Sequence, residues 1–199
     1  MKNKKMINTF NSKFTMALEL DEGRIKIRKL KISDAQDIYE NVKDEEVTRW
    51  TLNIPHPYPR DEAIKFIRRA HYRLKKKKGY DFGIVLKNTD EVIGMVSLGN
   101  IDWKNKNAEV GYWLGKKYWG KGLMAEAVKL ILKLGFEKLK LHRIYARLFE
   151  ENIGSKKVLE KCGFKLEAIM RETLFKHNKW HNELTYGILK KEYEKLATP

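Results

Sequence analysis

Residues 112–127 read Tyr112-Trp113-Leu114-Gly115-Lys116-Lys117-Tyr118-Trp119-Gly120-Lys121-Gly122-Leu123-Met124-Ala125-Glu126-Ala127, and no other segment says as much about the fold. The apolar end of a strand is followed by a loop with glycines and then by the start of a helix. Gly120 and Gly122 allow unusual dihedral angles and close approach of a ligand to the backbone. Free N–H groups at the start of the helix form a site suited to pyrophosphate. A glycine-containing turn alone more often only connects two elements, and this one matches neither the Walker A pattern nor Gly-x-Gly-x-x-Gly.

The segments on either side predict an alternation of strands and helices. Before the loop we expect strands at 24–30, 80–86, 92–101 and 108–114, with helices at 33–42 and 61–78. After it we expect a helix at 123–139, a strand at 142–149, a helix at 154–162 and strands at 164–169 and 184–189. Residues 50–59 and 177–182 are expected to be loops. The passage from the strand at 108–114 through a helix to the strand at 142–149 is a βαβ unit, so these two strands should be parallel.

The size and composition of the chain indicate one folded α/β domain. It has 199 residues, of which 42% are hydrophobic and 34% charged, which excludes a disordered chain. We expect a partly mobile N-terminal lead-in at 1–22 and a single domain at 23–195. Cys162 is the one cysteine, so no intramolecular disulfide forms, and a reducing, cytoplasmic location is expected. The best apolar stretch, 125–136, is too short to cross a membrane and contains two lysines.

The five histidines show no metal-ligand spacing, so no metal is expected. The formal net charge of +16 favours anionic partners such as nucleotides, RNA or acidic peptides. A solvated lysine-rich surface explains the charge equally well, because the lysines are spread along the whole chain. Residues 75–78 form the one tight lysine run, at a helix end where the helix dipole favours cations.

Two motifs give a resemblance to a known family. The run Glu109-Val110-Gly111-Tyr112-Trp113-Leu114, with Tyr118-Trp119-Gly120-Lys121-Gly122 and Glu126-Ala127, resembles the acetyl-CoA-binding motif of the GNAT acetyltransferases. Further on, Asn152-x-x-Ser155-x-x-Val158-Leu159-Glu160-Lys161-x-Gly163-Phe164 resembles their second motif. The residues of both motifs are similar to those of the RimJ/RimL type, which acetylates the N-termini of ribosomal proteins.

The resemblance implies the GNAT fold. This α/β (α+β) fold has a mixed, mostly antiparallel twisted sheet of about six or seven strands, flanked by about four helices. Strands 4 and 5, at 108–114 and 142–149, should splay apart. The chain departs from the general pattern at Trp119, where Gln or Arg is usual, and at Leu159, where a tyrosine often protonates the departing thiolate. Met124 replaces a small residue of the phosphate loop.

The resemblance also implies an activity and a set of site residues. Acetyl would pass directly from acetyl-CoA, the co-substrate, to an amine, with no metal. Glu109 and Glu167 are candidate bases, and Ser155 is a candidate donor to the thiolate; each could also be an ordinary surface or helix-start residue. Trp50 and Tyr58 are candidates for the acceptor site. The expected acetyl-CoA contacts are Trp113, Leu114, Gly115, Lys116, Trp119, Gly120, Lys121, Gly122, Leu123, Met124, Ala125, Asn152, Ser155 and Lys157.

The acceptor implied is the N-terminal α-amine of a protein, as in a ribosomal protein. An α-amine has a pKa of about 7.7–8.0 against about 10.4 for lysine, so one carboxylate acting through water suffices as base. Two alternatives stay open: a small-molecule N-acetyltransferase acting on a polyamine, aminoglycoside or amino acid, and a non-catalytic CoA- or RNA-binding protein. We also expect weak contact with RNA, no membrane as a partner, and a chain that is a monomer or a homodimer.

Overall fold

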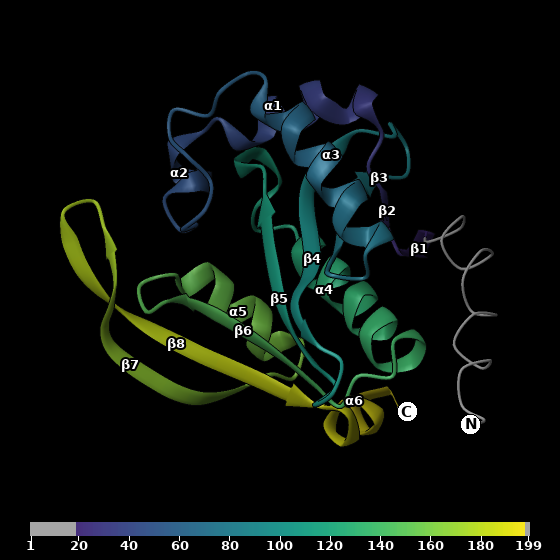
Figure 1. Ribbon diagram of the computed structural model, residues 1–199, viewed down its shortest axis with the longest axis vertical. Helices are drawn as coiled ribbons and strands as arrows, with labels where there is room; N and C mark the ends of the chain where they lie inside the picture. The colour runs from purple at the N-terminus through teal and green to yellow at the C-terminus, as the bar shows by residue number, and fades with distance from the viewer. Residues whose placement is uncertain (1–18, 198–199) are drawn as a thin grey trace, which may run out of the picture.

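The computed structural model describes residues 19–197 (Figure 1). Eight strands form one sheet in the order β1-β2-β3-β4-β5-β6-β8-β7, in which only β5 and β6 are parallel neighbours. The strands are β1 (Glu19–Glu22), β2 (Ile25–Lys29), β3 (Tyr80–Leu86), β4 (Val92–Asp102), β5 (Asn107–Leu114), β6 (Arg143–Phe149), β7 (Lys165–Lys176) and β8 (Lys179–Leu189). The helices are α1 (Ala35–Val42), α2 (Glu45–Thr48), α3 (Glu62–Lys75), α4 (Leu123–Lys133), α5 (Ile153–Lys161) and α6 (Lys190–Ala197).

The sheet divides where β5 and β6 part. Their pairing ends at Glu109 and Tyr145, whereas β5 runs on to Leu114 and β6 to Phe149. β5 stays paired with β4 and β6 stays paired with β8 over these lengths, so the two halves diverge as an open V (Figure 1). The expected parallel pair and its splay are thereby confirmed. The pair is fifth and sixth in the chain, rather than fourth and fifth, because β1 precedes the first expected strand.

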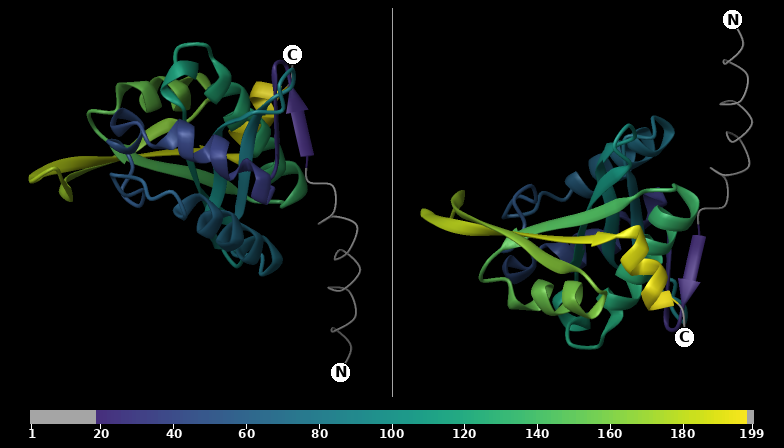
Figure 2. Two further views of the ribbon diagram at one scale, coloured as in Figure 1. Left: turned by 90° about the horizontal axis from the view of Figure 1, so that it is seen from above. Right: turned by 90° about the horizontal axis from the view of Figure 1, so that it is seen from below.

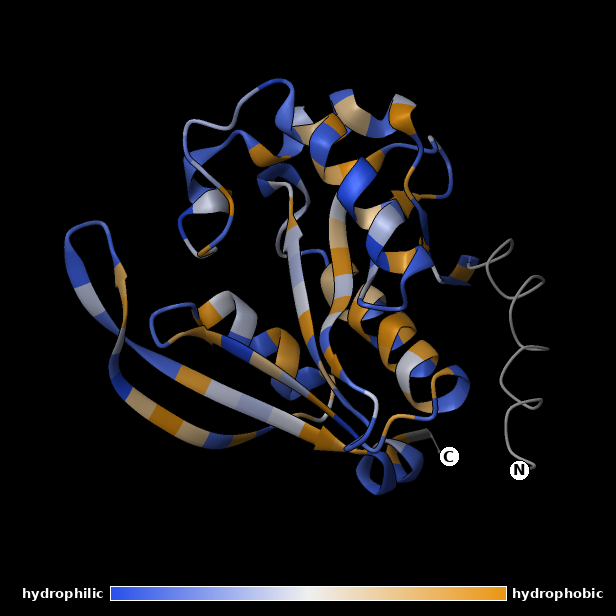
Figure 3. Cartoon of the chain, in the orientation of Figure 1, coloured by the Kyte–Doolittle hydropathy of each residue, from blue (hydrophilic) through white to orange (hydrophobic). Residues whose placement is uncertain are grey.

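Helices cover both faces of the sheet (Figure 2). α4 and α5 pack on one face, and their inward residues belong to the larger buried cluster together with β3 to β6. α1 and α3 pack on the other face through a second buried cluster that includes Ile38 and Ile67. α4 is apolar over most of its circumference (Figure 3), as expected for a helix enclosed between the sheet and its neighbours.

Several boundaries differ from those expected. β7 and β8 are longer, and the segment 177–182 is mostly strand, because the hairpin turns tightly at His177 and Asn178, both with positive φ. β7 is exposed on both faces over residues 165–173, and β8 begins with the exposed Lys179 and Trp180, so the polar sequence of this hairpin resembles that of a loop. α2 and α6 were not anticipated. The helix expected at 123–139 is α-helical to Lys133 and continues as a wider turn over Leu134–Lys138. Of the lead-in expected at 1–22, residues 19–22 form β1, and the rest lies outside the described residues.

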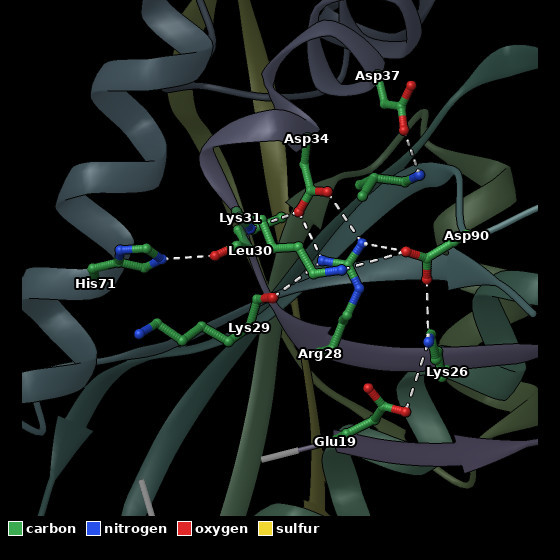
Figure 4. Close-up of polar contacts among 11 residues, drawn as sticks. Glu19, Lys26, Arg28, Lys29, Leu30, Lys31, Asp34, Asp37, His71 and Asp90 are labelled. Carbon is green, nitrogen blue, oxygen red and sulfur yellow. Dashed lines mark hydrogen bonds and ion pairs between the residues drawn. The ribbon is translucent and has the colours of Figure 1, made fainter. Parts of the chain in front are cut away.

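A buried ion pair fixes the reversal from β2 into α1 (Figure 4). The Arg28 guanidinium donates to both oxygens of Asp34, at 2.7 and 3.1 Å. The backbone N–H of Lys31 donates to the same carboxylate, at 2.7 Å. The next turn of α1 is tied to the start of β4, because the Val92 N–H donates to Asp37 at 3.0 Å. α1 is thus held rigidly against the sheet, and the chain that follows it reaches the open end of the V.

Within the described part of the chain, none of the helices combines the length and apolar character that crossing a bilayer requires.

Candidate functional site

The loop before α4 presents a row of unbonded backbone amides. Gly122 is the N-cap of α4 with φ 78°, and Gly120 has φ 73°. Among the residues that the structure describes, nothing accepts a hydrogen bond from the N–H groups of residues 120–125, and the first bonded amide is Glu126, to the Gly122 carbonyl at 3.2 Å. A Cβ at Gly120 would meet nothing within 4 Å, so the loop is open to a ligand. Amides at a helix start attract a phosphate group, so the expected pyrophosphate site fits this loop.

Two side chains hold this loop in place. Trp119 donates its indole N–H to the Leu114 carbonyl at 2.6 Å, which folds the loop back onto the end of β5. Arg24, at the turn between β1 and β2, donates to the Lys121 carbonyl at 2.6 Å and to the Glu126 carboxylate at 2.6 Å. Its side chain is 58% exposed and lies beside the amides, as a cation near a phosphate would. No sequence signal pointed to Arg24, because it comes about 100 residues before the loop that it supports.

Ser155 meets Tyr112 on the α5 side of the V. The two hydroxyls are 2.7 Å apart, and either can donate. The Asn152 side chain accepts from the Ser155 N–H at 3.0 Å, so Asn152 is the N-cap of α5. Burial raises the pKa of Tyr112, which therefore keeps its proton. Leu159, by contrast, is fully buried in the core. Sequence reasoning missed Tyr112, although a tyrosine at an inward position of a strand that lines the V was a usable signal.

Glu109 lies on the opposite face of β5 from Tyr112, because side chains alternate along a strand and the two residues are three apart. Its carboxylate accepts from Arg147 at 3.1 Å through each oxygen, and from Asn100 at 2.7 Å. A carboxylate has about four acceptor positions, so one remains for a water molecule. Because Glu109 is the last β5 residue paired with β6, it stands at the base of the V.

Glu167 is further from the V. Its carboxylate lies over Gly187 of β8 and accepts from Arg143. Gly187 pairs with Tyr145, which in turn pairs with Glu109, so the Glu167 carboxylate lies above the second strand from Glu109, while Glu167 itself is on β7, three strands away across the sheet. The geometry therefore brings Glu109 and Ser155 to the V from its two faces, and it leaves Glu167 to one side.

Two hollows adjoin the V on the α1 and α3 side. The first, of about 570 Å³, lies at the end of β6 and includes Trp50, whose ring is 6.0 Å from that of Phe149. The second, of about 850 Å³, lies over β4 and β5 and includes Glu109 and Arg147. Phe149 lines the first hollow and Arg147 lines the second, and because the two residues are two positions apart on β6 the hollows lie next to each other along this strand. Tyr58, expected beside Trp50, is instead only 9% exposed and packs against Tyr39 in the second core cluster.

The remaining expected contacts divide into backbone and side-chain groups. Leu123, Met124 and Ala125 are buried, so they can offer a ligand only their amides, and the Met124 side chain does not obstruct the loop. The Gly115 amide donates to the Ile93 carbonyl at 2.9 Å. No acceptor for the Lys116 amide is found within residues 19–197, so this amide can face a ligand in the V. Lys157 is exposed on α5, and Trp113 is half-buried on β5.

Comparisons with known sequences agree with this geometry. The family model described as "Acetyltransferase (GNAT) domain" matches residues 24–165. An uncharacterized N-acetyltransferase of Bacillus licheniformis is 34% identical over 170 residues, which is 85% of this chain and 95% of its own. Ribosomal-protein-serine acetyltransferase of Escherichia coli is 27% identical over 56% of this chain and 62% of its own. Spermidine N(1)-acetyltransferase of Escherichia coli is 23% identical over 85% of this chain and 88% of its own.

Solved structures share the fold. Ribosomal-protein-S5-alanine acetyltransferase from Vibrio fischeri superposes with a TM-score of 0.79 at 25% identity, covering 89% of this chain and 99% of that one. RimL, an acetyltransferase of ribosomal L7/L12 solved with coenzyme A, superposes with a TM-score of 0.77 at 19% identity, covering 84% of this chain and 95% of that one.

Proposed function

The chain belongs to the GNAT acetyltransferase family and is an N-acetyltransferase, and from this premise we propose that it acetylates the N-terminal α-amine of a protein or peptide with acetyl-CoA. Ribosomal proteins are the acceptors named for the Escherichia coli and Vibrio fischeri enzymes at 27% and 25% identity compared above, and the proposal includes them. A cytoplasmic location belongs to the same proposal, because ribosomal acceptors and acetyl-CoA occur there.

The chain offers a fitting set of groups for acetyl-CoA. The amides of residues 120–125 would hold the pyrophosphate, and Arg24 adds a cation beside them. The Lys116 amide would face the pantetheine arm at the end of β5. Acetyl-CoA supplies a thioester, a carbonyl that an amine nitrogen can attack with cleavage of the C–S bond.

The two faces of the V offer a group for each of two needs of this reaction: removal of a proton from the ammonium, and stabilisation of the departing thiolate. An ammonium is not a nucleophile, so its proton must leave before attack. Glu109 takes this proton through one water, at the acceptor position that Arg147 and Asn100 leave open. On the other face the Ser155 hydroxyl donates a hydrogen bond to the thiolate sulfur that forms when the C–S bond breaks. Tyr112 orients that hydroxyl. Tyr112 is a positioning residue, because it acts through Ser155.

The observation that carries the choice of acceptor is the pair of adjoining hollows. Ligand pockets for single small molecules have volumes of about 300–1,000 Å³. Each of the two hollows, of about 570 and 850 Å³, lies within this range, and the two lie next to each other along β6 on the α1 and α3 side of the V. Two neighbouring hollows suit an extended polypeptide better than a single small amine.

A small-amine acceptor is the second candidate, and one observation favours it. The first hollow contains three carboxylates, which would attract a polyamine: Glu45, Glu46 and Glu151. Two of them are already paired, however, since Lys116 contacts Glu46 at 2.7 Å and His181 contacts Glu151 at 2.9 Å.

A kinetic comparison of acceptors tests the proposal. The full chain, with acetyl-CoA, is assayed on a panel of peptides with free N-termini, on the same peptides with blocked N-termini, and on spermidine. We expect a kcat/KM at least about a hundredfold higher for the free peptides than for spermidine, because only a peptide fills both hollows. If the chain acetylates spermidine and none of the peptides, the acceptor is a small amine and the second candidate function is correct.

Arg24 should contribute to acetyl-CoA affinity. Arg24→Ala releases the Lys121 carbonyl and removes the cation beside the amides, and we expect CoA to bind about tenfold more weakly by titration calorimetry, or about 1.4 kcal/mol. Lys26→Ala, two residues on and remote from the loop, is the matched control and should bind CoA normally. Equal affinity in Arg24→Ala and the parent would show that the loop needs no such support.

A further inference from the structure

The second hollow is strongly cationic. Its lining includes Arg73, Lys76, Lys77, Lys78 and Arg147 against the single carboxylate of Glu109. The two arginines have carboxylate partners, Asp81 for Arg73 at 2.9 Å and Glu109 for Arg147 at 3.1 Å. The three lysines have no ion pair with any residue that the structure describes. The helix dipole accounts for cations in the last turn of α3, but it does not explain three further lysines beyond the helix end at Lys75.

The backbone of the lysine segment is held over the sheet, and the lysine side chains are exposed. Trp103, which follows β4, donates its indole N–H to the Lys77 carbonyl at 3.1 Å. The Lys78 N–H donates to the Arg73 carbonyl at 2.9 Å and closes the end of α3. These bonds fix the lysine segment above the end of β4 and the start of β5.

The floor of the hollow is lined by small residues and by one guanidinium group. Ser97, Gly99 and Gly111 belong to its lining, and the Arg73 guanidinium lies over Gly99, 3.0 Å from where a Cβ would be. An extended chain on this floor would therefore meet the Arg73 cation between the lysines and the V. Asn107 begins β5 at the lysine end, and Gly111 lies beyond Glu109 where the V has opened. These two residues are four positions apart on one strand, or about 13 Å, which is the length of four extended residues.

The charges along this floor are ordered. Glu109 stands at the base of the V, where an amine must arrive, and the lysines stand at the far end. We propose that the second hollow binds an acidic segment of the acceptor, which carries Asp or Glu at about the second to fifth residues after its N-terminal amine. This inference rests on the proposed function for the amine and adds a chemical class for the residues that follow it. The direct connection to the V favours a polypeptide over RNA, because the same ligand must place an amine there.

The test measures binding without turnover. The full chain with bound CoA, which carries no acetyl group, is titrated by calorimetry with the peptide Ser-Ala-Asp-Glu-Asp-Glu and with its amide counterpart Ser-Ala-Asn-Gln-Asn-Gln. We expect the acidic peptide to bind at least about tenfold more tightly, the sum of several modest exposed ion pairs. The preference should weaken as salt increases.

Two charge-reversed variants locate the effect. Lys76→Glu with Lys78→Glu should abolish the preference, whereas Lys129→Glu with Lys133→Glu, both exposed on α4, should retain it. Lys77 is left intact because its φ of 53° makes it a poor site for substitution.

Three results would overturn the inference: equal affinity for both peptides, a preference that survives in the Lys76 and Lys78 variant, or single-stranded RNA binding more tightly than the acidic peptide and being lost in that variant. Absence of acetylation on every peptide would refute the proposed function alone, because the binding measurement does not depend on turnover.

Discussion

Gly122→Asp is expected to weaken CoA binding by about a hundredfold, or about 2.7 kcal/mol, without loss of the fold. Gly122 caps α4 in a left-handed conformation, and its amide belongs to the open row at residues 120–125. A carboxylate here would repel a pyrophosphate at short range. It would also compete for Arg24, whose Nη2 lies 3.8 Å from the position of the new Cβ. Calorimetry measures the affinity, and circular dichroism checks the fold.

Gly122→Asn is the matched control. Asparagine has the size and shape of aspartate and tolerates the left-handed region, but it carries no charge. We expect most of the CoA affinity to remain in this variant. If Asp and Asn weaken CoA equally, shape rather than charge is responsible. If a folded Gly122→Asp chain binds CoA as tightly as the parent, the pyrophosphate does not lie over this loop.

Glu109→Gln should lower kcat by about 10²- to 10⁴-fold, the usual range for loss of a general base. Glutamine keeps the shape of the side chain and removes its basicity. Arg147 would not be left without a partner, because Glu183 lies 3.8 Å from it. CoA affinity should not change, since Glu109 is on the face of β5 away from α5. Steady-state kinetics with a peptide acceptor measures the effect.

The pH dependence separates a base from a structural group. The α-amine of a peptide has a pKa of about 7.7–8.0, so above this range it loses its proton to water without help. Activity of Glu109→Gln should therefore rise with pH more steeply than that of the parent and recover in part above this range. Glu167→Gln, on β7 three strands away, is the control and should keep most of its activity. If kcat falls further in Glu167→Gln than in Glu109→Gln, Glu167 is the base. If kcat falls by less than tenfold in both variants, no single carboxylate acts as the base.

Local sequence patterns predicted the elements that enclose the site. The glycines at 120 and 122 marked the loop, and the strand-helix-strand order around it required β5 and β6 to be parallel. The β7–β8 hairpin was harder, because β7 is exposed on both faces over its first nine residues, 165–173, and lacks the alternation that marks a half-buried strand. The short α2 has too few residues to show a helical period.

The site was predictable only where its residues lie close together in sequence. The open amides follow from one loop, whereas Arg24 and Tyr112 act through contacts with residues 97 and 43 positions away. No pattern in a single sequence records such pairs. Tyr58 shows the opposite error: an aromatic in a proline-rich loop suggested a binding surface, but its ring fills the space between α1 and α3 and is buried there. Burial of a loop residue depends on packing partners that the local sequence does not name.

The central claim is that acetyl passes from acetyl-CoA to an α-amine. The most direct measurement supplies acetyl-CoA labelled in its acetyl group, together with a peptide that has a free N-terminus and an internal lysine, and locates the label by fragmentation mass spectrometry. We predict that the label appears on the N-terminal residue and is absent from the lysine side chain. Label on the lysine, or transfer to spermidine but not to the peptide, would contradict the account.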